Sequence, residues 1–446
     1  MIYELGNQIL MNTMQAIKTL QKRSAAFVVA LAVCLAVPAA GGDVFHAVVA
    51  ADGTGDYTSV QQAIDAAPAG RAEPWLIFVK GGSYEESVTV PADKPFIHLI
   101  GQDKEHTIIH RSLNVGGQPQ AGKDSAYWAH SVHNPQSPVY KAEGSVMTIE
   151  ANDFYTAGIS YVNDFGVESQ SGPQALAMKS DGDRLSFFDC AFRSFQDTWM
   201  TTTNDACRHY VKDCFIEGAV DYFYGSGDVL LEYCTLYNVR RGSVIVAPCH
   251  EKSKWGYVFR HCIVDGNAEA ARDGKTKLGR PWHNSPRAVY IHTTMNIPVA
   301  PEGWTDMGAI PALFAEYDSR DAQGNPVDLS RRKSEYKGRG DNPSTGTCPT
   351  TVTKAEADRM TYENIIPGND GWNPREMMRR LPAPQDVKVE GNAVTWQAVD
   401  GAIGYVVIAG DRVAGITDGT SLTLPSPAGD GSLRVRAVNR SGTLGE

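Results

Sequence analysis

A repeat of 24 residues constrains the fold of this chain more than any other feature of its sequence. Residues 184–190 read Arg-Leu-Ser-Phe-Phe-Asp-Cys, and residues 208–214 read Arg-His-Tyr-Val-Lys-Asp-Cys. Weaker copies that also end in cysteine occupy residues 230–234 and 258–262. Strand segments that recur at this spacing, with variable loops between them, are typical of the coils of a parallel β-helix. We therefore predict a right-handed parallel β-helix with an inward ladder of Cys190, Cys214, Cys234 and Cys262; unrelated hairpin strands are the alternative.

The remaining sequence is typical of an all-β protein. Short apolar and β-branched runs are broken by Gly, Asn and Asp. Apolar residues recur at helical spacing only at 60–67, before Pro68, which predicts one short helix. After Arg380, a Pro-rich stretch precedes alternating strands around Trp396 and Tyr405, which predicts a small β-sandwich. The predicted organisation is listed by residue range: signal peptide 1–40, β-helix domain 41–378, linker 379–384, β-sandwich 385–446.

The amino-terminal residues have the layout of a secretory signal peptide. Three basic residues precede an apolar run at 25–37, and small residues follow it. We expect a secreted or periplasmic protein without a membrane span in its mature chain, an uncleaved anchor being the alternative. Cleavage after residue 40 leaves 38 basic and 50 acidic residues, a net charge of −12 that argues against binding nucleic acid. Seven cysteines remain, so at least one is free or pairs between chains.

Two aspartates occupy the same position in successive repeats. Asp197 lies seven residues beyond Cys190, and Asp221 lies seven residues beyond Cys214. Neighbouring coils are roughly 4.8 Å apart, so the two carboxyl groups should lie close together. Mutual repulsion then raises one pKa and leaves an acid beside a carboxylate, which suits a hydrolase. Two unrelated loop aspartates are the alternative; nearby amides and aromatic residues favour a sugar-binding site, and these are Gln174, Gln196, Trp199, Tyr222, Phe223 and Tyr224.

Six short motifs follow one another along the chain. They are Gly-Asp-Tyr-Thr-Ser-Val-Gln-Gln-Ala-Ile-Asp-Ala (55–66), Gly-Ser-Tyr-Glu-Glu (82–86), Gln-Ala-Leu-Ala-Met (174–178), Gln-Asp-Thr-Trp-Met (196–200), Asp-Tyr-Phe-Tyr-Gly (221–225) and Leu-Gly-Arg-Pro-Trp (278–282). In order and spacing they resemble the motif set of the pectin methylesterases, from about Val44 to about Trp372. The chain departs mildly from that set, with Trp-Met at 199–200 in place of Leu-Tyr and tyrosines at 222 and 224 where phenylalanine is commoner.

The resemblance implies an esterase that removes methyl groups from galacturonate in pectin and releases methanol. It implies Asp221 as nucleophile, Asp197 as general acid and then base, and Arg280 as the group that orients Asp221 and keeps it ionised. Gln174 and Gln196 would donate to the oxyanion, and Trp282 would stack on a sugar ring. We place Tyr222 and Trp199 among the substrate-binding residues. The β-sandwich resembles a fibronectin type III module; we expect a monomer without metal or other cofactor.

Other functions fit the sequence less well. A pectin-cleaving glycosidase or lyase on the same fold could also use two carboxylates, but the chain lacks the Asp-Asp and Gly-His-Gly motifs that β-helical polygalacturonases share. It also lacks the Gly-x-Ser-x-Gly motif of serine esterases. His130 and His133 form the closest histidine pair, without the further ligands of a zinc site. A non-catalytic β-helical adhesin would explain the repeat but not the Gln, Asp and Arg residues.

Overall fold

The computed structural model describes residues 44–116, 125–341, 343–425 and 432–446. The predicted signal peptide at 1–40 lies outside these ranges. Every helix within them is too short or too polar to cross a bilayer.

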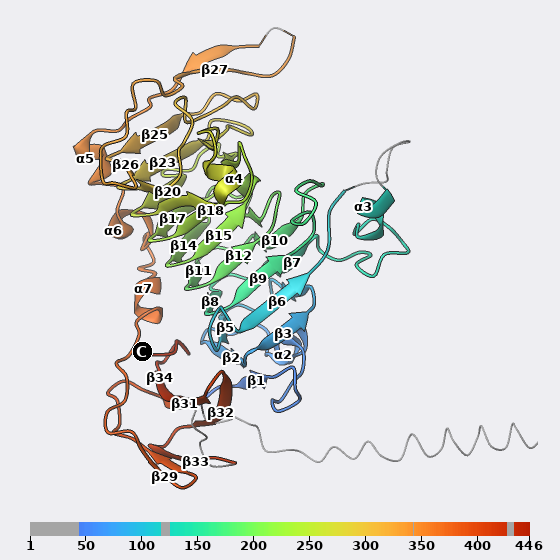
Figure 1. Ribbon diagram of the computed structural model, residues 1–446, viewed down its shortest axis with the longest axis vertical. Helices are drawn as coiled ribbons and strands as arrows, with labels where there is room; N and C mark the ends of the chain where they lie inside the picture. The colour runs from blue at the N-terminus through green and yellow to red at the C-terminus, as the bar shows by residue number, and fades with distance from the viewer. Residues whose placement is uncertain (1–43, 117–124, 342, 426–431) are drawn as a thin grey trace, which may run out of the picture. The chain divides into compact units, whose positions relative to one another are not determined.

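The coils stack into a β-helix whose faces are three parallel sheets (Figure 1). The ten-stranded sheet contains, in spatial order, β1 (Ala47–Val49), β2 (Trp75–Val79), β5 (Ile97–Gly101), β8 (Tyr155–Ala157), β11 (Leu185–Phe188), β14 (Arg208–Lys212), β17 (Asp228–Glu232), β20 (Tyr257–Arg260), β23 (Arg287–Ile291) and β25 (Leu313–Tyr317). The nine-stranded sheet contains β3 (Gly82–Glu85), β6 (Thr107–Arg111), β9 (Ser160–Asn163), β12 (Ala191–Arg193), β15 (Phe215–Gly218), β18 (Thr235–Asn238), β21 (Ile263–Gly266), β24 (Thr294–Met295) and β26 (Arg320–Asp321). The seven-stranded sheet contains β4 (Val88–Val90), β7 (Ser145–Ile149), β10 (Leu176–Ser180), β13 (Trp199–Met200), β16 (Val220–Gly225), β19 (Val244–Pro248) and β22 (Lys277–Gly279).

The sequence repeat corresponds to one coil. β11 pairs in parallel with β14, with Leu185 opposite His209 and Phe188 opposite Lys212. The repeat ends in Asp-Cys because the chain turns there: Asp189 and Asp213 have positive φ angles of 50° and 55°, which aspartate tolerates better than most residues. The cysteine that follows points inward in each coil. The predicted ladder of Cys190, Cys214, Cys234 and Cys262 is confirmed, since all four are buried and their strands are in register.

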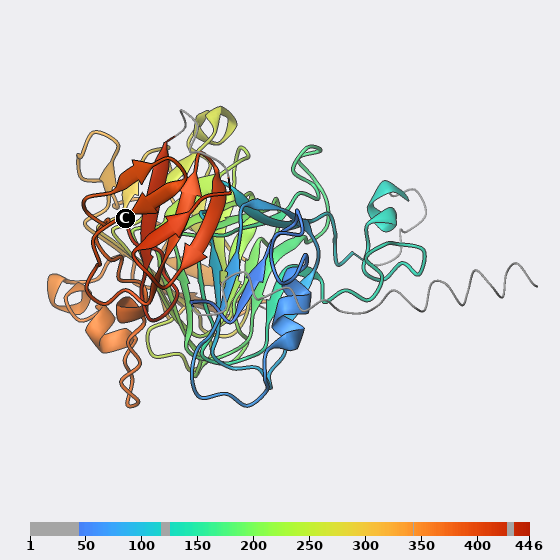
Figure 2. The ribbon, with the colours of Figure 1, turned by 90° about the horizontal axis from the view of Figure 1, so that it is seen from below.

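Short helices accompany the coils. α2 (Val60–Ala66) matches the predicted helix; the Ser59 side chain caps it by accepting a hydrogen bond from the Gln62 amide. Figure 2 shows α2 beside the stacked sheets and α3 (Ser125–Ala129) on an arm that projects outward. The other helices within the described residues are α4 (Ala268–Ala271), α5 (Lys354–Ala357), α6 (Tyr362–Ile365) and α7 (Pro374–Met377). The two-stranded sheet comprises β27 (Glu335–Lys337) and β28 (Thr345–Thr347).

Two antiparallel sheets of three strands follow the helices. One contains β29 (Lys388–Glu390), β30 (Ala393–Thr395) and β33 (Ser421–Thr423), and the other contains β32 (Arg412–Thr417), β31 (Gly404–Ala409) and β34 (Leu433–Val438). They share a core that includes Trp396, Tyr405 and Leu381, which is 3% exposed although it lies in the predicted linker. The sheets are small, but they enclose apolar side chains of their own.

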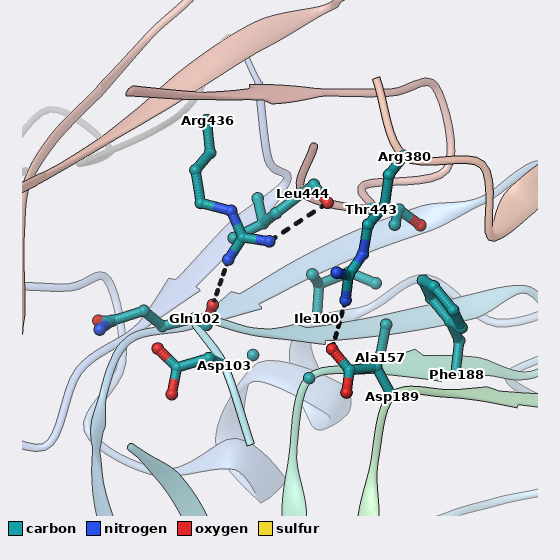
Figure 3. A pocket seen from close by; sticks show the side chains of 12 residues that line it. Ile100, Gln102, Asp103, Ala157, Phe188, Asp189, Arg380, Arg436, Thr443 and Leu444 are labelled. Atoms are coloured by element: carbon teal, nitrogen blue, oxygen red, sulfur yellow. Dashed lines mark hydrogen bonds and ion pairs between the residues drawn. The ribbon is translucent and has the colours of Figure 1, made fainter. Parts of the chain in front are cut away.

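The carboxy-terminal region also packs on the outer face of the ten-stranded sheet. Val406 and Ile408 of β31 belong to the same apolar cluster as Phe78, Ile100 and other outward residues of that sheet. Polar contacts surround this cluster (Figure 3): Arg436 donates to the Gln102 carbonyl at 3.0 Å, and Arg380 pairs with Asp189. A cavity of about 30 Å³ lies there, far too small for a sugar ring.

Candidate active site

Both aspartates lie at the beginning of strands in the seven-stranded sheet. Asp221 is the second residue of β16, and Asp197 precedes β13 by two residues. The Asp197 amide donates to the Val220 carbonyl at 2.9 Å, which holds the two aspartates on neighbouring coils. The pairing of β16 with β19 shifts between Val220 and Phe223, so Asp221 lies in a bulge. Their φ angles of 60° and 48° place both in the left-handed region, a strained geometry that is common at functional sites.

Arg280 distinguishes the two carboxyl groups. Its Nε donates to Asp221 Oδ1 at 2.7 Å, and its Nη2 donates to Asp221 Oδ2 at 2.5 Å. This paired geometry fixes the plane of a carboxylate that is only 6% exposed. Gly279, the residue before Arg280, allows the close approach of β22 to β19, because a Cβ there would lie 2.8 Å from the Val246 carbonyl oxygen.

Burial raises the pKa of both carboxyl groups. Burial, and then the charge of Asp221, raises the pKa of Asp197 to about 8, although Arg280 and a hydrogen bond from Gln196 act in the opposite direction. Burial also raises the pKa of Asp221, against the two hydrogen bonds from Arg280. The expected lowering by Arg280 is therefore real but smaller than the effect of desolvation. With its pKa raised to about 8, Asp197 favours the protonated form at neutral pH.

Gln196 lies beside Asp197 and makes a side-chain hydrogen bond with it, and Gln174 lies one coil earlier. Gln196 precedes Asp197 and is partly buried, whereas Gln174 is exposed. The Ala175 amide donates to the Gln196 carbonyl at 3.0 Å, so these residues lie on adjacent coils. Amides next to a carboxylate and a carboxylic acid can stabilise an oxyanion.

A family model for pectinesterases matches residues 46–340. The chain belongs to the pectinesterase family. It is 33% identical to pectinesterase 31 of Arabidopsis thaliana over 279 residues, which cover 60% of this chain and 80% of that protein. It is 26% identical to a pectinesterase of Petunia integrifolia over 296 residues, 62% of this chain and 70% of that protein. In other relatives the match spans 64% or 32% of their length. The prediction of an enzyme of the pectinesterase class is confirmed.

Solved structures of the family share the fold. The pectin methylesterase from carrot superposes with a TM-score of 0.58 at 24% identity, over 73% of this chain and 94% of that one. The pectin methylesterase from Erwinia chrysanthemi gives 0.55 at 23% identity, over 73% and 98%. A pectin methylesterase solved with a bound hexasaccharide also gives 0.55. The predicted class, an all-β protein built on a right-handed parallel β-helix, is thereby confirmed.

The prediction that Trp199 and Tyr222 bind the substrate of this pectinesterase is wrong. Trp199 and Tyr222 are fully buried inside the β-helix, where Trp199 Nε1 donates to Ser180 Oγ at 2.8 Å and Tyr222 OH donates to Asn238 Oδ1 at 3.4 Å. Met200, which follows Trp199, and Tyr224, two residues beyond Tyr222, face outward instead. Alternation along a strand fixes which residue faces inward, but the bulge at Asp221 shifts that alternation in β16, so sequence alone could not assign the face of Tyr222.

Trp282 lies on the outer face of the β-helix. It is partly buried and contacts the ring of Tyr224 edge-to-face at 5.7 Å between centroids. Together with other outward side chains it forms an apolar stripe across the coils, whose members are Val115, Leu176, Met200, Tyr224, Ala247, Trp282 and Met307. Such a stripe beside the two carboxyl groups can hold the apolar faces of sugar rings.

Arg240 is a further charged residue near the site that no motif indicated. Its guanidinium lies 5.6 Å from the ring of Phe195, two residues before Asp197. Burial, and then the charge of Arg280, lowers the pKa of Arg240. The basic pair at residues 240–241 was the only sequence signal for it.

No group of three or more metal-ligating side chains occurs within the described ranges, and His130 contacts Phe165 at 5.9 Å between centroids.

Proposed function

We propose that this chain hydrolyses the methyl esters of galacturonate residues in pectin and releases methanol. The proposal rests on one observation: the carboxyl groups of Asp221 and Asp197 lie on neighbouring coils. Arg280 donates hydrogen bonds to both oxygens of Asp221, and the pKa of Asp197 is raised to about 8. A fixed carboxylate beside a carboxylic acid is the pair that acyl transfer to and from water requires.

In the first step, an oxygen of Asp221 attacks the C6 carbonyl carbon of the methylated sugar. The carbonyl oxygen becomes an oxyanion, to which the side-chain amides of Gln174 and Gln196 donate hydrogen bonds. The bond from C6 to the methoxy oxygen then breaks, and Asp197 gives its proton to that oxygen, so that methanol leaves. Asp221 is now joined to the sugar as an acid anhydride.

In the second step, Asp197 has lost its proton and acts as a base. It takes a proton from water as the water oxygen attacks C6 of the anhydride. The bond from C6 to Asp221 breaks, which frees the galacturonate carboxyl group and restores both aspartates. Trp282, with Tyr224 and Met200 in place of the two buried aromatic residues, would hold the sugar rings.

Methanol release from highly methylated pectin tests the function. Wild-type protein should release methanol, and Asp221→Asn should abolish the release with the fold intact. Asp213→Asn is a matched control, because Asp213 has a similar positive φ of 55° in a turn outside the site. Near-normal activity of Asp221→Asn would refute the nucleophile. New reducing ends without methanol would indicate a glycosidase, and binding without either product an adhesin.

The organisation of the chain is part of the proposal. We propose a cleaved signal peptide at 1–40, export from the cytoplasm, and a monomer. The domain limits remain 41–378 for the β-helix and 385–446 for a module like fibronectin type III, with 379–384 between them. Support for the module comes from its two antiparallel sheets and its enclosed Trp396 and Tyr405. Mass spectrometry of the exported protein would locate the cleavage site, and light scattering would measure its mass.

A further inference from the structure

A surface loop carries Gln174, one of the two amides proposed to donate to the oxyanion. The loop, residues 164–173, follows β9 and leads directly into Gln174 and β10. Its Gly166 and Gly172 have positive φ angles of 81° and 143°, conformations that glycine adopts more readily than other residues do. The Gln174 side chain is exposed and makes no hydrogen bond to another residue that the structure describes. Its position therefore depends on what holds the loop.

A neighbouring arm of the chain borders the end of this loop. The arm joins β6 to β7, and its described residues are 112–116 and 125–144. The Val115 amide of the arm donates to the Gln174 carbonyl at 3.0 Å. At Gly116, a Cβ would lie only 3.0 Å from the ring of Pro173, so the arm and the loop approach closely there. These contacts fix the backbone at Gln174 but not the rest of the loop.

Tyr127 of the arm holds the rest of the loop. Its hydroxyl lies 2.9 Å from Ser171 Oγ, three residues before Gln174. Its ring contacts the Phe165 ring edge-to-face at 5.7 Å between centroids, at the beginning of the loop. The Asn114 side chain donates to the Tyr127 carbonyl at 2.8 Å, which joins Tyr127 to the first part of the arm. Tyr127 therefore connects both ends of the loop to a segment that is hydrogen-bonded beside Gln174.

We propose that Tyr127 is a positioning residue, which holds the loop through Ser171 and Phe165 so that the Gln174 amide is directed at the oxyanion. This inference rests on the proposed function. An oxyanion donor lowers the barrier only if it is already directed at the place where charge develops, because reorienting it during the reaction costs free energy. The oxyanion is absent from the bound ester, so a misplaced Gln174 should lower kcat and leave KM unchanged.

Tyr127→Phe tests the inference, because it removes the hydroxyl and keeps the ring that contacts Phe165. Methanol release should show kcat lowered about three- to tenfold with KM unchanged, the range expected for one hydrogen bond. Ser171→Ala removes the other partner and should give the same loss, and the double variant should lose no more than either single variant. Tyr140→Phe is the matched control, because Tyr140 is an exposed tyrosine of the same arm, and it should keep the wild-type kcat.

A second pair of variants tests whether Tyr127 acts through Gln174. Gln174→Ala should lower kcat about 100-fold, as the loss of one oxyanion donor does. Adding Tyr127→Phe to Gln174→Ala should then change kcat less than about twofold, since no donor is left to position. A purely structural role of Tyr127 would instead lower kcat by the same factor with and without the Gln174 amide.

The outcomes separate the two proposals. If wild-type protein releases no methanol, the proposed function fails. If it releases methanol but Tyr127→Phe and Ser171→Ala keep the wild-type kcat, the positioning role fails while the function stands. An equal loss with and without the Gln174 amide would also overturn the positioning role, as would a change in KM alone. If Tyr127→Phe does not fold, Ser171→Ala decides the matter in the same two backgrounds.

Discussion

Asp197→Asn should inactivate the protein. It should also raise the free energy of unfolding, by an amount that depends on pH. The folded protein raises the pKa of Asp197 from an ordinary value of 3.8 to about 8, so the folded state holds this proton more tightly than the unfolded chain does. The stabilisation from that proton is complete below pH 3.8 and is lost as the pH rises through about 8. The loss is about 1.4 kcal/mol per pH unit, or roughly 3 kcal/mol between pH 5 and pH 7.

An asparagine has no proton to hold, so the variant escapes this loss. We expect the difference in unfolding free energy between Asp197→Asn and wild type to be larger at pH 7 than at pH 5 by about 3 kcal/mol. Urea unfolding at pH 5, 6 and 7 would measure it, with Asp213→Asn as the control for changing a left-handed aspartate to asparagine. A difference that stays constant across this range would refute the reasoning, because it would show that Asp197 is ionised in the folded protein throughout.

Three further perturbations follow from contacts in the structure. Arg280→Lys should lower kcat/KM at least about tenfold and move the acidic limb of the pH–rate profile to higher pH, since losing the paired hydrogen bonds raises the pKa of Asp221; an unmoved limb would contradict this. Thr198→Val removes the 2.8 Å hydrogen bond that the hydroxyl of the fully buried Thr198 donates to the Glu217 carbonyl on the next coil. Unfolding in urea should show a loss of about 1–3 kcal/mol, and kcat should fall more than KM changes, whereas Thr198→Ser should restore both. Arg332→Met removes the ion-pair partner of the fully buried Glu316, whose Oε1 lies 2.6 Å from Arg332 Nε. The free energy of unfolding should fall by about 3–5 kcal/mol, and adding Glu316→Gln should recover part of this loss. An undiminished loss in the double variant would argue that an unpaired charge is not its cause.

The coils were predictable because the turn chemistry repeats. Each Asp-Cys sequence marks a left-handed turn followed by an inward side chain, so the spacing of Cys190 and Cys214 reports the length of a coil. The outward faces were harder to predict. The apolar residue Tyr210 points outward from the ten-stranded sheet, where it contacts Tyr362, a residue more than 100 positions later in the chain. A pattern within one coil contains no information about that covering.

The repeat makes the two aspartates equivalent, and only a distant residue makes them different. Asp197 and Asp221 have the same place in successive coils and similar left-handed backbones. Arg280 lies 59 residues beyond Asp221 in the sequence. It reaches Asp221 because it directly follows β22, which stacks next to β19, and β19 in turn pairs with β16, the strand of Asp221. Nothing in the spacing of the repeat selects which aspartate receives the guanidinium; a sequence motif could only suggest it. The chemical asymmetry therefore arises from stacking: the coil that receives Arg280 acquires the fixed carboxylate, and its neighbour, buried without a cation of its own, retains the proton.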